Sequence, residues 1–547
     1  MNKAVILFLG FVLIFSAFKV RSQEYYWVAF NYKNQTSYSL GEPEKFLSER
    51  AIQRRIRQNI SIDSLDLPVN ASYIQQVIAL GVELVHASKW LNGITVKSET
   101  DSFATSIWQL PFVKEVQLTK PDTEATKSAK NKFVETGYHD ARSNVESEYG
   151  TSEYQIDLMN GRLLHDRNYR GQGMQIAVLD AGFYHADSYS AFDSLWVNNQ
   201  ILGTRDFVDP NSDFFNTHYH GMSVLSCMGG NLPGELIGTA PKASYWLLRS
   251  EDVPTEYIIE EDNWVVAAEY ADSVGCDIIN TSLGYYTFDD PTTDHSYTDM
   301  DGHTTRVTKA ANIAFSRGML VFASAGNEAR YAWKYIIAPA DGDDVIAVGA
   351  VNRDSVPASF SSFGPAADGD VKPNVTGVGE NAYVVKSNGV TGFYNGTSFS
   401  SPIMAGMAAC LWQVNPDANA ATVKEIIEMS AHKYQNPDSI VGYGIPDMEK
   451  AFQMMSDLLK ISEHPRQKWL AYPNPAWESL ILLTSEIISE NNLVIEIFSL
   501  DGKLLRKWTR PPSQTIELYN LNSLPTGILL LRIENGGDVE TIKISKM

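Results

Sequence analysis

Residues 394–402 read Tyr-Asn-Gly-Thr-Ser-Phe-Ser-Ser-Pro and run directly into the apolar decapeptide Ile-Met-Ala-Gly-Met-Ala-Ala-Cys-Leu-Trp at 403–412. Gly396 and Thr397 suit a tight turn, Pro402 is tolerated in the first turn of a helix, and Ala, Met and Leu favour helix propagation. The pattern therefore places Ser398 at a helix N-terminus, where unpaired N–H groups and the positive dipole end suit a nucleophile beside a developing oxyanion. An ordinary Ser/Thr cap before a core helix has the same pattern.

Three other stretches end or begin in polar side chains. Residues 174–183 contain a short apolar run of strand length that is closed by Asp180 and Gly182, and residues 320–327 form a second such run that ends in Asn327. His220 is followed by Gly221 and by a helix-compatible run of small and apolar residues. A carboxylate, an imidazole, an amide and a hydroxyl thus follow one another along the chain.

The order Asp180, His220, Asn327, Ser398 resembles that of the subtilisin-like serine proteases, or subtilases, in which Asp precedes His and Ser. The resemblance covers roughly residues 154–452. The matching motifs are Asp180-Ala181-Gly182, Asn280-Thr281-Ser282-Leu283-Gly284, Ser324-Ala325-Gly326-Asn327 and Asn395-Gly396-Thr397-Ser398 with Ser401-Pro402. One departure is Ser223, which stands where the family usually has a second His.

The resemblance implies an acyl-transfer mechanism. Ser398 needs a base that can take its proton near neutral pH, and His220 fits that role. Asp180 would orient the imidazole, while Asn327 and the backbone N–H of Ser398 would hold the oxyanion. His218 competes with His220 for the role of base, but only His220 is followed by Gly and a helix-compatible run.

The same resemblance implies walls along which a substrate strand would pair through its backbone. They are formed by Ser282, Leu283, Gly284, Ala325 and Gly326. No cofactor is expected for catalysis. A structural calcium ion is left open and unassigned, and the acidic stretch 289–303 is interpreted as a solvated insertion.

Two classes of function follow. The first is a secreted serine endopeptidase that is made as a precursor and acts on proteins or peptides. The second is a surface binding protein on a catalytically degenerate protease scaffold. The complete set of Asp180, His220, Asn327 and Ser398 favours the first.

Helices and strands alternate through residues 151–460, the predicted peptidase domain. This alternation predicts an α/β fold, with a mainly parallel sheet and helices on both faces. Functional side chains gather at the strand C-termini of such sheets, where Asp180 and Asn327 fall. Cys227, Cys276 and Cys410 are too few for a disulfide framework, so buried thiols are expected.

The N-terminal part of the chain suggests a processed precursor. Residues 1–22 have the features of a signal peptide: a basic residue near the N-terminus, an apolar core and small residues near the expected cleavage site. An uncleaved membrane anchor is the alternative. Residues 23–120 predict a compact α+β unit that resembles a subtilase propeptide, an inhibitor and folding chaperone; an unrelated binding domain is the alternative. Residues 121–150 have the polar composition of a linker.

Residues 466–547 change character again. Short strands separated by Gly and Pro turns predict a small β-sandwich. Tyr472-Pro473-Asn474-Pro475, Asp501-Gly502-Lys503 and Leu524-Pro525-Thr526-Gly527 together resemble the C-terminal sorting domain of the bacterial type IX secretion system. A substrate-binding β-domain is the alternative. If the tail is a sorting domain, the protein is exported through the periplasm of a Gram-negative bacterium and is secreted or attached to the surface.

The net charge of the chain limits the classes of partner that it can bind. The 547-residue chain has a formal net charge of -21 and a pI near 4.9. Such a balance argues against nucleic acids and anionic membrane surfaces as partners. The expected partners are therefore substrates, the chain's own propeptide and the secretion machinery, with no transmembrane segment in the mature chain.

Overall fold

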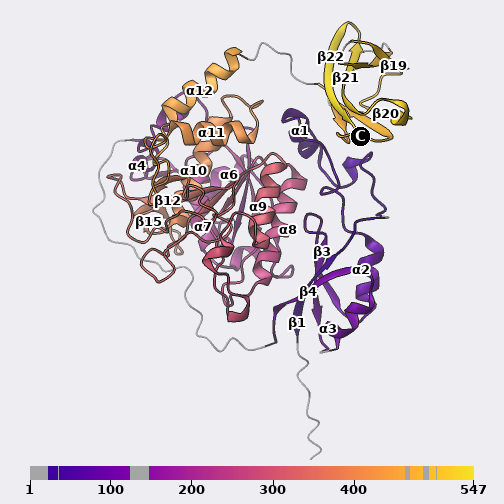
Figure 1. Cartoon of the computed structure of the whole chain (residues 1–547). Coiled ribbons are helices and arrows are strands. Elements are labelled where there is room, and N and C mark those ends of the chain that lie inside the picture. Colours follow the sequence, from indigo (N-terminus) through magenta and orange to yellow (C-terminus); the bar gives the residue numbers. More distant parts are fainter. Residues whose placement is uncertain are drawn as a thin grey trace, which may run out of the picture.

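The computed structural model describes residues 23–34, 36–100, 102–122, 147–461, 468–484, 492–500 and 502–547. They form an N-terminal unit, a central domain and a C-terminal domain (Figure 1). The predicted signal peptide at 1–22 and residues 123–146 of the predicted linker lie outside the described residues. Among the helices that the structure does describe, none combines the length and apolar composition that crossing a bilayer requires.

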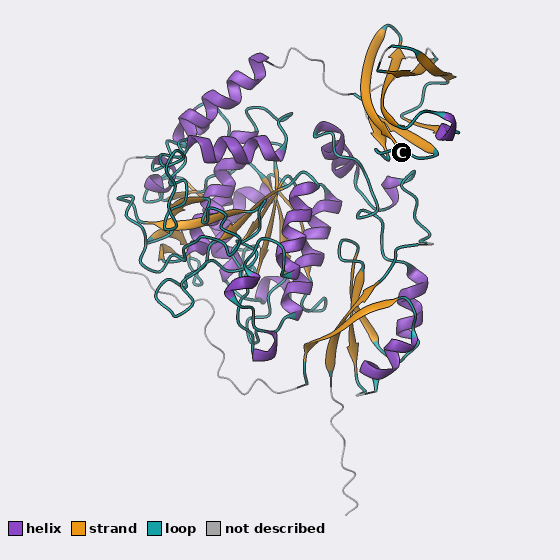
Figure 2. Cartoon of the chain, in the orientation of Figure 1, coloured by secondary structure: helices purple, strands orange, loops and turns teal. Residues whose placement is uncertain are grey.

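The central domain is built on a seven-stranded sheet in the order β13-β12-β11-β10-β5-β9-β6, in which every neighbouring pair is parallel. Its strands are β5 (Gln175–Asp180), β6 (Ile201–Asp206), β9 (Ser244–Arg249), β10 (Ile278–Thr281), β11 (Leu320–Ser324), β12 (Ile346–Val351) and β13 (Val375–Val378). Figure 2 shows the sheet between helices. The predicted α/β fold is confirmed.

Alternating side chains of the buried strands enter two different cores. Ile176 and Val178 of β5 pack with α7 (His220–Gly229) and α10 (Thr397–Trp412), whereas Ala177 and Leu179 pack with α8 (Ile259–Val274) and α9 (Arg306–Ser316). This alternation is how a parallel sheet covers both faces with helices. The three thiols, Cys227, Cys276 and Cys410, are unpaired and buried as predicted.

Smaller elements complete the central domain. They are α4 (Glu153–Asp157), α5 (Arg162–Asp166), α6 (Asp193–Val197), α11 (Ala420–Ser430), α12 (Met448–Ile461) and the strand pairs β7 (Asn231–Leu232) with β8 (Leu236–Ile237) and β14 (Ala382–Val385) with β15 (Thr391–Tyr394). The sequence pattern predicts helices over 263–274 and 308–317; the structure starts these helices earlier, α8 at Ile259 and α9 at Arg306.

The N-terminal unit is a four-stranded antiparallel sheet with short helices. Its elements are β1 (Glu24–Phe30), α1 (Glu49–Arg57), α2 (Ala71–Ile78), β2 (Glu83–Ser88), β3 (Gly93–Ser98), α3 (Phe103–Ser106) and β4 (Val113–Lys120), with the sheet order β2-β3-β1-β4. The basic composition of residues 43–58 predicts one helix over that range. Helix α1 begins only at Glu49, because the Ser48 Oγ caps it by accepting from the Ala51 N–H at 3.2 Å.

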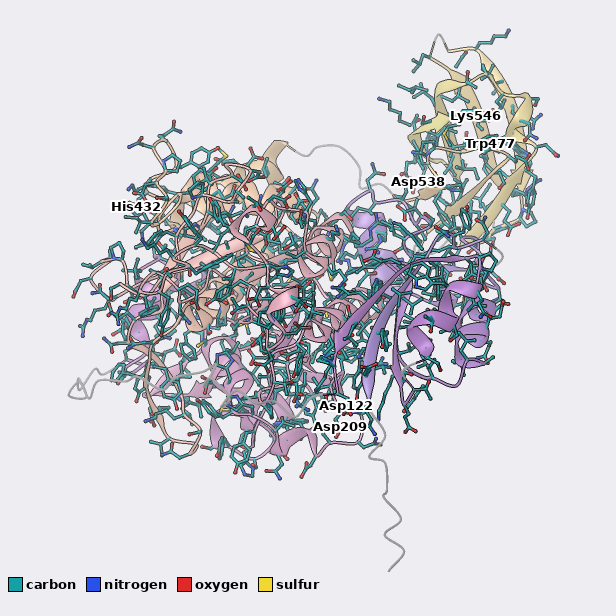
Figure 3. All side chains as sticks on the ribbon, turned by 60° about the horizontal axis from the view of Figure 1, so that its bottom comes forward. Asp122, Asp209, His432, Trp477, Asp538 and Lys546 are labelled. Carbon is teal, nitrogen blue, oxygen red and sulfur yellow. The ribbon has the colours of Figure 1, made fainter. Side chains whose placement is uncertain are left out.

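The C-terminal domain is the predicted β-sandwich. One sheet contains β16 (Leu470–Tyr472), β17 (Ser479–Leu483) and β20 (Thr515–Tyr519); the other contains β19 (Leu504–Arg510), β18 (Leu493–Ser499), β21 (Gly527–Asn535) and β22 (Asp538–Lys546). Side chains from both sheets share one apolar core. Trp477, Asp538 and Lys546 mark this domain in Figure 3.

Helix α1 docks on the C-terminal ends of two helices of the central domain. The Arg50 Nε donates to the carbonyl of Gly275, the C-cap of α8, at 3.0 Å. The Arg54 Nε donates to the carbonyl of Arg317, the C-cap of α9, at 3.1 Å. Cations at helix C-termini satisfy otherwise unpaired carbonyls and complement the negative dipole end.

Asp272 links this docking helix to the central domain through a buried ion network. Its Oδ1 lies 2.5 Å from Arg54 and 2.8 Å from Arg55, and all three side chains are 0% exposed. Its Oδ2 lies 2.9 Å from the Lys89 Nζ. Burial alone would raise the pKa of Asp272, but Arg55, Lys89 and Arg54 hold it well below its ordinary value. The contribution of this carboxylate to docking is therefore complete above about pH 4 and is lost as the pH falls further.

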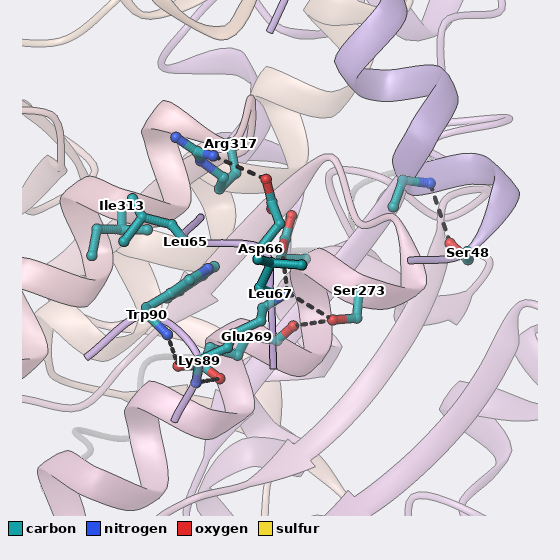
Figure 4. Close-up of polar contacts among 12 residues, drawn as sticks. Ser48, Leu65, Asp66, Leu67, Lys89, Trp90, Glu269, Ser273, Ile313 and Arg317 are labelled. Atoms are coloured by element: carbon teal, nitrogen blue, oxygen red, sulfur yellow. Dashed lines mark hydrogen bonds and ion pairs between the residues drawn. The ribbon is translucent and has the colours of Figure 1, made fainter. Parts of the chain in front are cut away.

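A second contact joins the loop between β2 and β3 to α8 (Figure 4). The Glu269 carboxylate accepts from the backbone N–H groups of Lys89 at 2.9 Å and Trp90 at 3.0 Å, while the Lys89 Nζ reaches the Ser273 Oγ at 3.0 Å. Figure 4 also shows Asp66 of the N-terminal unit facing Arg317 of the central domain. The N-terminal unit is thus fixed to the helices of one sheet face.

Asp272→Asn should loosen the docking of α1, because it leaves Arg54 and Arg55 buried without their shared carboxylate. Breaking a buried pair in this way costs about 3–5 kcal/mol. Hydrogen exchange of the α1 amides in the full chain should report that loss of protection.

The matched control is Glu42→Gln, which removes an exposed ion pair with Lys45. Exposed pairs contribute little, so α1 protection should not change. Equal protection in the Asp272→Asn and Glu42→Gln variants would contradict the assignment of docking to the buried network.

Candidate active site

Asp180 and His220 meet at the carboxyl edge of the parallel sheet. Asp180 is the last residue of β5 and His220 the first of α7. The Asp180 Oδ1 lies 2.7 Å from the His220 Nδ1 and also accepts from the Ala181 N–H at 2.7 Å. Both side chains are buried, at 0% and 4% exposure. The carboxylate is therefore held by backbone and aimed at one ring nitrogen, so that it can fix the tautomer of the imidazole.

Gly221 allows this approach. A Cβ on Gly221 would lie 2.5 Å from the Gly182 carbonyl oxygen and 2.8 Å from the Asp180 Cβ. Both distances are shorter than any ordinary carbon contact, so a side chain here would displace the Asp180 strand end or the start of α7. Glycine is therefore required after His220 for steric reasons.

His218 lies beside the pair but is placed differently. Its Nδ1 accepts from the backbone N–H of His220 at 3.3 Å. Burial, with the neighbouring charges of His220 and Arg249, lowers the pKa of His218 to about 3. His218 is therefore neutral near neutral pH, and the carboxylate of Asp180 faces His220.

Ser398 is the second residue of α10, and Pro402 lies in the second turn rather than the first turn predicted from sequence. Because Pro402 has no N–H, the Ser398 carbonyl lacks its usual helical donor four residues on. The Ser282 Oγ donates to that carbonyl instead, at 2.8 Å, and the Ser398 Oγ contacts the Ser282 carbonyl at 3.4 Å. Ser282 therefore fixes the turn of helix that carries Ser398.

Asn327 is positioned by Thr397, to which the sequence patterns assigned a place in the turn but no contact with Asn327. The Asn327 Oδ1 accepts from the Thr397 N–H at 2.9 Å and from the Thr397 Oγ1 at 3.1 Å. The Thr397 Oγ1 in turn accepts from the Gly326 N–H at 3.2 Å. With its oxygen occupied, Asn327 presents its amide nitrogen as the donor, 3.7 Å from a Cβ built on Gly396. The position of a Thr directly before the candidate nucleophile was the one sequence feature that could have indicated this role.

The stretch after Ser398 also approaches His220. The ring of Phe399 lies 6.0 Å from that of His220, centroid to centroid. The structure thus gathers Asp180, His220, Asn327 and the N-terminus of α10 at one edge of the sheet.

The predicted substrate walls follow two neighbouring parallel strands. Ser282, Leu283 and Gly284 follow β10, and Ala325 and Gly326 follow β11, which pairs with it. Leu283 and Ala325 are buried in the core, at 4% and 0% exposure. The apolar side chains of Leu283 and Tyr285-Tyr286 would suit an apolar cleft, but Leu283 and Tyr285 pack in that core. Because these side chains are buried, the residues that follow β10 and β11 can contact a substrate mainly through their backbone groups.

A group of carboxylates in the described part of the chain could hold a cation. Oxygens of Glu251, Glu256 and Glu260 lie within 4.8 Å of one another, and the Tyr285 hydroxyl donates to Glu251 at 3.1 Å. Carboxylate oxygens are ligands that Ca²⁺ accepts.

The acidic stretch 289–303, interpreted from sequence as a solvated insertion, is joined to α8 through a histidine. His295 of this stretch contacts the buried Glu261 of α8 at 2.5 Å.

Comparison with known proteins assigns each unit. Residues 171–444 match the Subtilase family, residues 25–134 the Peptidase S8 propeptide domain of Bacteroidota, and residues 470–547 the secretion system C-terminal sorting domain.

Among individual proteins, subtilisin NAT of Bacillus subtilis subsp. natto is 28% identical over 316 residues, covering 56% of this chain and 74% of that protein. Serine protease AprX of Bacillus subtilis strain 168 is 30% identical over 312 residues, covering 51% and 66%. The crystal structure of MycP1 with its N-terminal propeptide removed aligns with a TM-score of 0.43 at 22% identity, covering 55% and 96%.

Gly221→Ala should slow the reaction of Ser398 with a fluorophosphonate by about 10²-fold, because a displacement of about 1 Å at a reacting group has that effect. Labelling rates measured by mass spectrometry would test this. Gly377→Ala is the control, since its added Cβ would meet no atom closer than 3.4 Å. Unchanged labelling in a folded Gly221→Ala protein would show that the close approach is not needed.

Proposed function

Since the chain belongs to the subtilase family, we propose that it hydrolyses peptide bonds through Asp180, His220 and Ser398. The single observation that carries the assignment is the buried contact of 2.7 Å between the Asp180 Oδ1 and the His220 Nδ1. A Ser hydroxyl at its free pKa is a weak nucleophile and needs a base oriented in this manner.

The proposed reaction has two halves. The His220 Nε2 accepts the Ser398 proton as Oγ attacks the substrate carbonyl, and Asp180 stabilises the resulting imidazolium. The Asn327 amide and the Ser398 N–H stabilise the oxyanion. His220 then gives its proton to the leaving amine, and an acyl-enzyme remains on Ser398. Water attacks that ester with His220 again as base, the Ser398 Oγ leaves and takes the proton back from His220, and the carboxylic acid is released. Each bond made is balanced by one broken, so the side chains suffice without a cofactor.

Substrate binding follows from the strand ends of β10 and β11. We assign Ser282, Leu283, Gly284, Ala325 and Gly326 to backbone pairing with an extended peptide. Before maturation the propeptide contacts the peptidase domain near the end of β9, a strand of the same sheet that ends at Arg249. Its strand β4 ends at Lys120, whose Nζ lies 3.3 Å from Asp252 of the peptidase domain.

The chain is a serine endopeptidase made with a propeptide, and its sorting domain marks it as secreted or exposed at the cell surface. We propose that it reaches that location through the periplasm of a Gram-negative bacterium, with the predicted signal peptide at 1–22 starting the route. A degenerate binding protein would have no need to retain all of Asp180, His220, Asn327 and Ser398, so we do not favour that alternative.

Ser398→Ala and His220→Ala should each abolish hydrolysis of casein or a peptide by the matured enzyme while leaving the fold intact, and the double variant should lose little more. Asn327→Ala should lower turnover by about 10²–10³, the known effect in subtilisin itself, carried over from that enzyme. His218→Ala is the control and should retain much more activity than His220→Ala. Full activity in purified Ser398→Ala would overturn the assignment.

Truncation after Glu463 should leave activity per molecule nearly unchanged, because the sorting domain has its own core and supplies no catalytic residue. In the native host the truncated protein should accumulate in the periplasm. A fluorescent reporter fused to residues 469–547 should reach the surface or the medium. If the truncated enzyme reached the medium at the full-length level, the tail would not act as a sorting signal here.

A further inference from the structure

The sheet β16-β17-β20 of the sorting domain has two apolar faces. Its alternate residues Trp469, Ala471, Leu480 and Leu482 enter the core of the sandwich, whereas Leu470, Tyr472, Ile481 and Leu483 belong to a separate cluster. The register pairs Leu470 with Leu483 and Tyr472 with Ile481, so the second set lies together on the outer face. The outer face of a small antiparallel sandwich is ordinarily polar and solvated. We call this apolar set the outer face.

The propeptide covers the outer face. The buried cluster that contains Leu470, Tyr472 and Leu483 is completed by Leu47, Ala51, Ile52, Ile56 and Ile62 of the propeptide, and by no residue of the peptidase domain among those described. Tyr472 is 0% exposed and Leu470 2%. Figure 1 shows α1 between the peptidase domain and the sorting domain.

A second contact comes from the turn before α1. A Cβ on Gly41 would lie 2.9 Å from the Ile481 Cδ1 and 3.7 Å from the Glu517 Oε1. Glu517 pairs with Ile481 across the sheet. Gly41 therefore lies in contact with the sorting domain, where an added side chain would push against the end of the Ile481 side chain.

Helix α1 thus has two different sides. Arg50 and Arg54, four residues apart, donate to carbonyls at the ends of α8 and α9. Ile52 and Ile56, also four residues apart, lie on the opposite side and pack on the outer face. One short helix contacts the peptidase domain through cations and the sorting domain through aliphatic side chains.

We propose that the propeptide is an adaptor that docks the sorting domain on the precursor, through Gly41 and the aliphatic side of α1. Removal of the propeptide would then do two things: free the peptidase and uncover the outer face of the sorting domain. The proposal depends on the assignments of the two end domains and not on the catalytic triad, so it can be tested in an inactive protein.

The test uses full-length protein carrying Ser398→Ala and a cleavage sequence for a specific protease inserted between Ile461 and Lys468. After cutting, the sorting domain should still co-elute with the rest of the chain in size-exclusion chromatography at micromolar concentration. Gly41→Glu, which places a carboxylate beside Glu517, and Ile481→Asp should each make it elute separately. Ile528→Asp, on a side chain 41% exposed elsewhere in the domain, is the matched control and should still co-elute.

Circular dichroism of each variant checks that the domains fold. Separation of the sorting domain from the unsubstituted protein would overturn the proposal, as would co-elution in both interface variants. Release by Ile481→Asp but not by Gly41→Glu would also overturn it, since the outer face would then dock on something other than the propeptide.

Discussion

The buried hydrogen bond between Asp180 and His220 is the constraint on which the proposed active site depends. It requires a strand that ends in a carboxylate, a helix that starts with the imidazole, and a glycine at 221 where the two backbones approach. A parallel sheet supplies this arrangement because the carboxyl ends of its strands meet at one edge. The N-terminus of α10 brings Ser398 to the same edge, and Ser282 compensates for the hydrogen bond that Pro402 cannot make.

The propeptide satisfies a different constraint. Helices α8 and α9 end in carbonyl groups that would otherwise need water. Arg50 and Arg54 of α1 donate to them, and Arg54 also shares the buried Asp272 with Arg55. Buried ion pairs are weak evidence for net stability but are costly to break singly. The network therefore makes docking specific and sensitive to acid, whereas the apolar side of α1 makes the same segment the contact surface for the sorting domain.

Local motifs predicted most of the fold and the candidate site, and long-range contacts limited the rest. Asp180, His220 and Ser398 could be predicted because each lies next to a short local pattern: Asp180 ends an apolar strand, whereas His220 and Ser398 lie at the start of helix-compatible runs. The positioning role of Thr397 was missed because its hydrogen bonds to Asn327 and Gly326 join residues about 70 positions apart. Arginines in the predicted basic helix would ordinarily be solvated, yet their partner Asp272 lies more than 200 residues away, which no local pattern reveals. The first-turn position predicted for Pro402 was wrong because the helix begins at Thr397.

The most direct test of the account is a pre-steady-state measurement on the matured enzyme with a chromogenic ester, followed by mass spectrometry of the quenched protein. A burst of released alcohol equal to the concentration of active sites is expected, with the acyl group on Ser398, because acyl-enzyme formation precedes a slower attack by water. The burst should disappear in His220→Ala. An acyl group on another residue, or a burst that persists without His220, would contradict it.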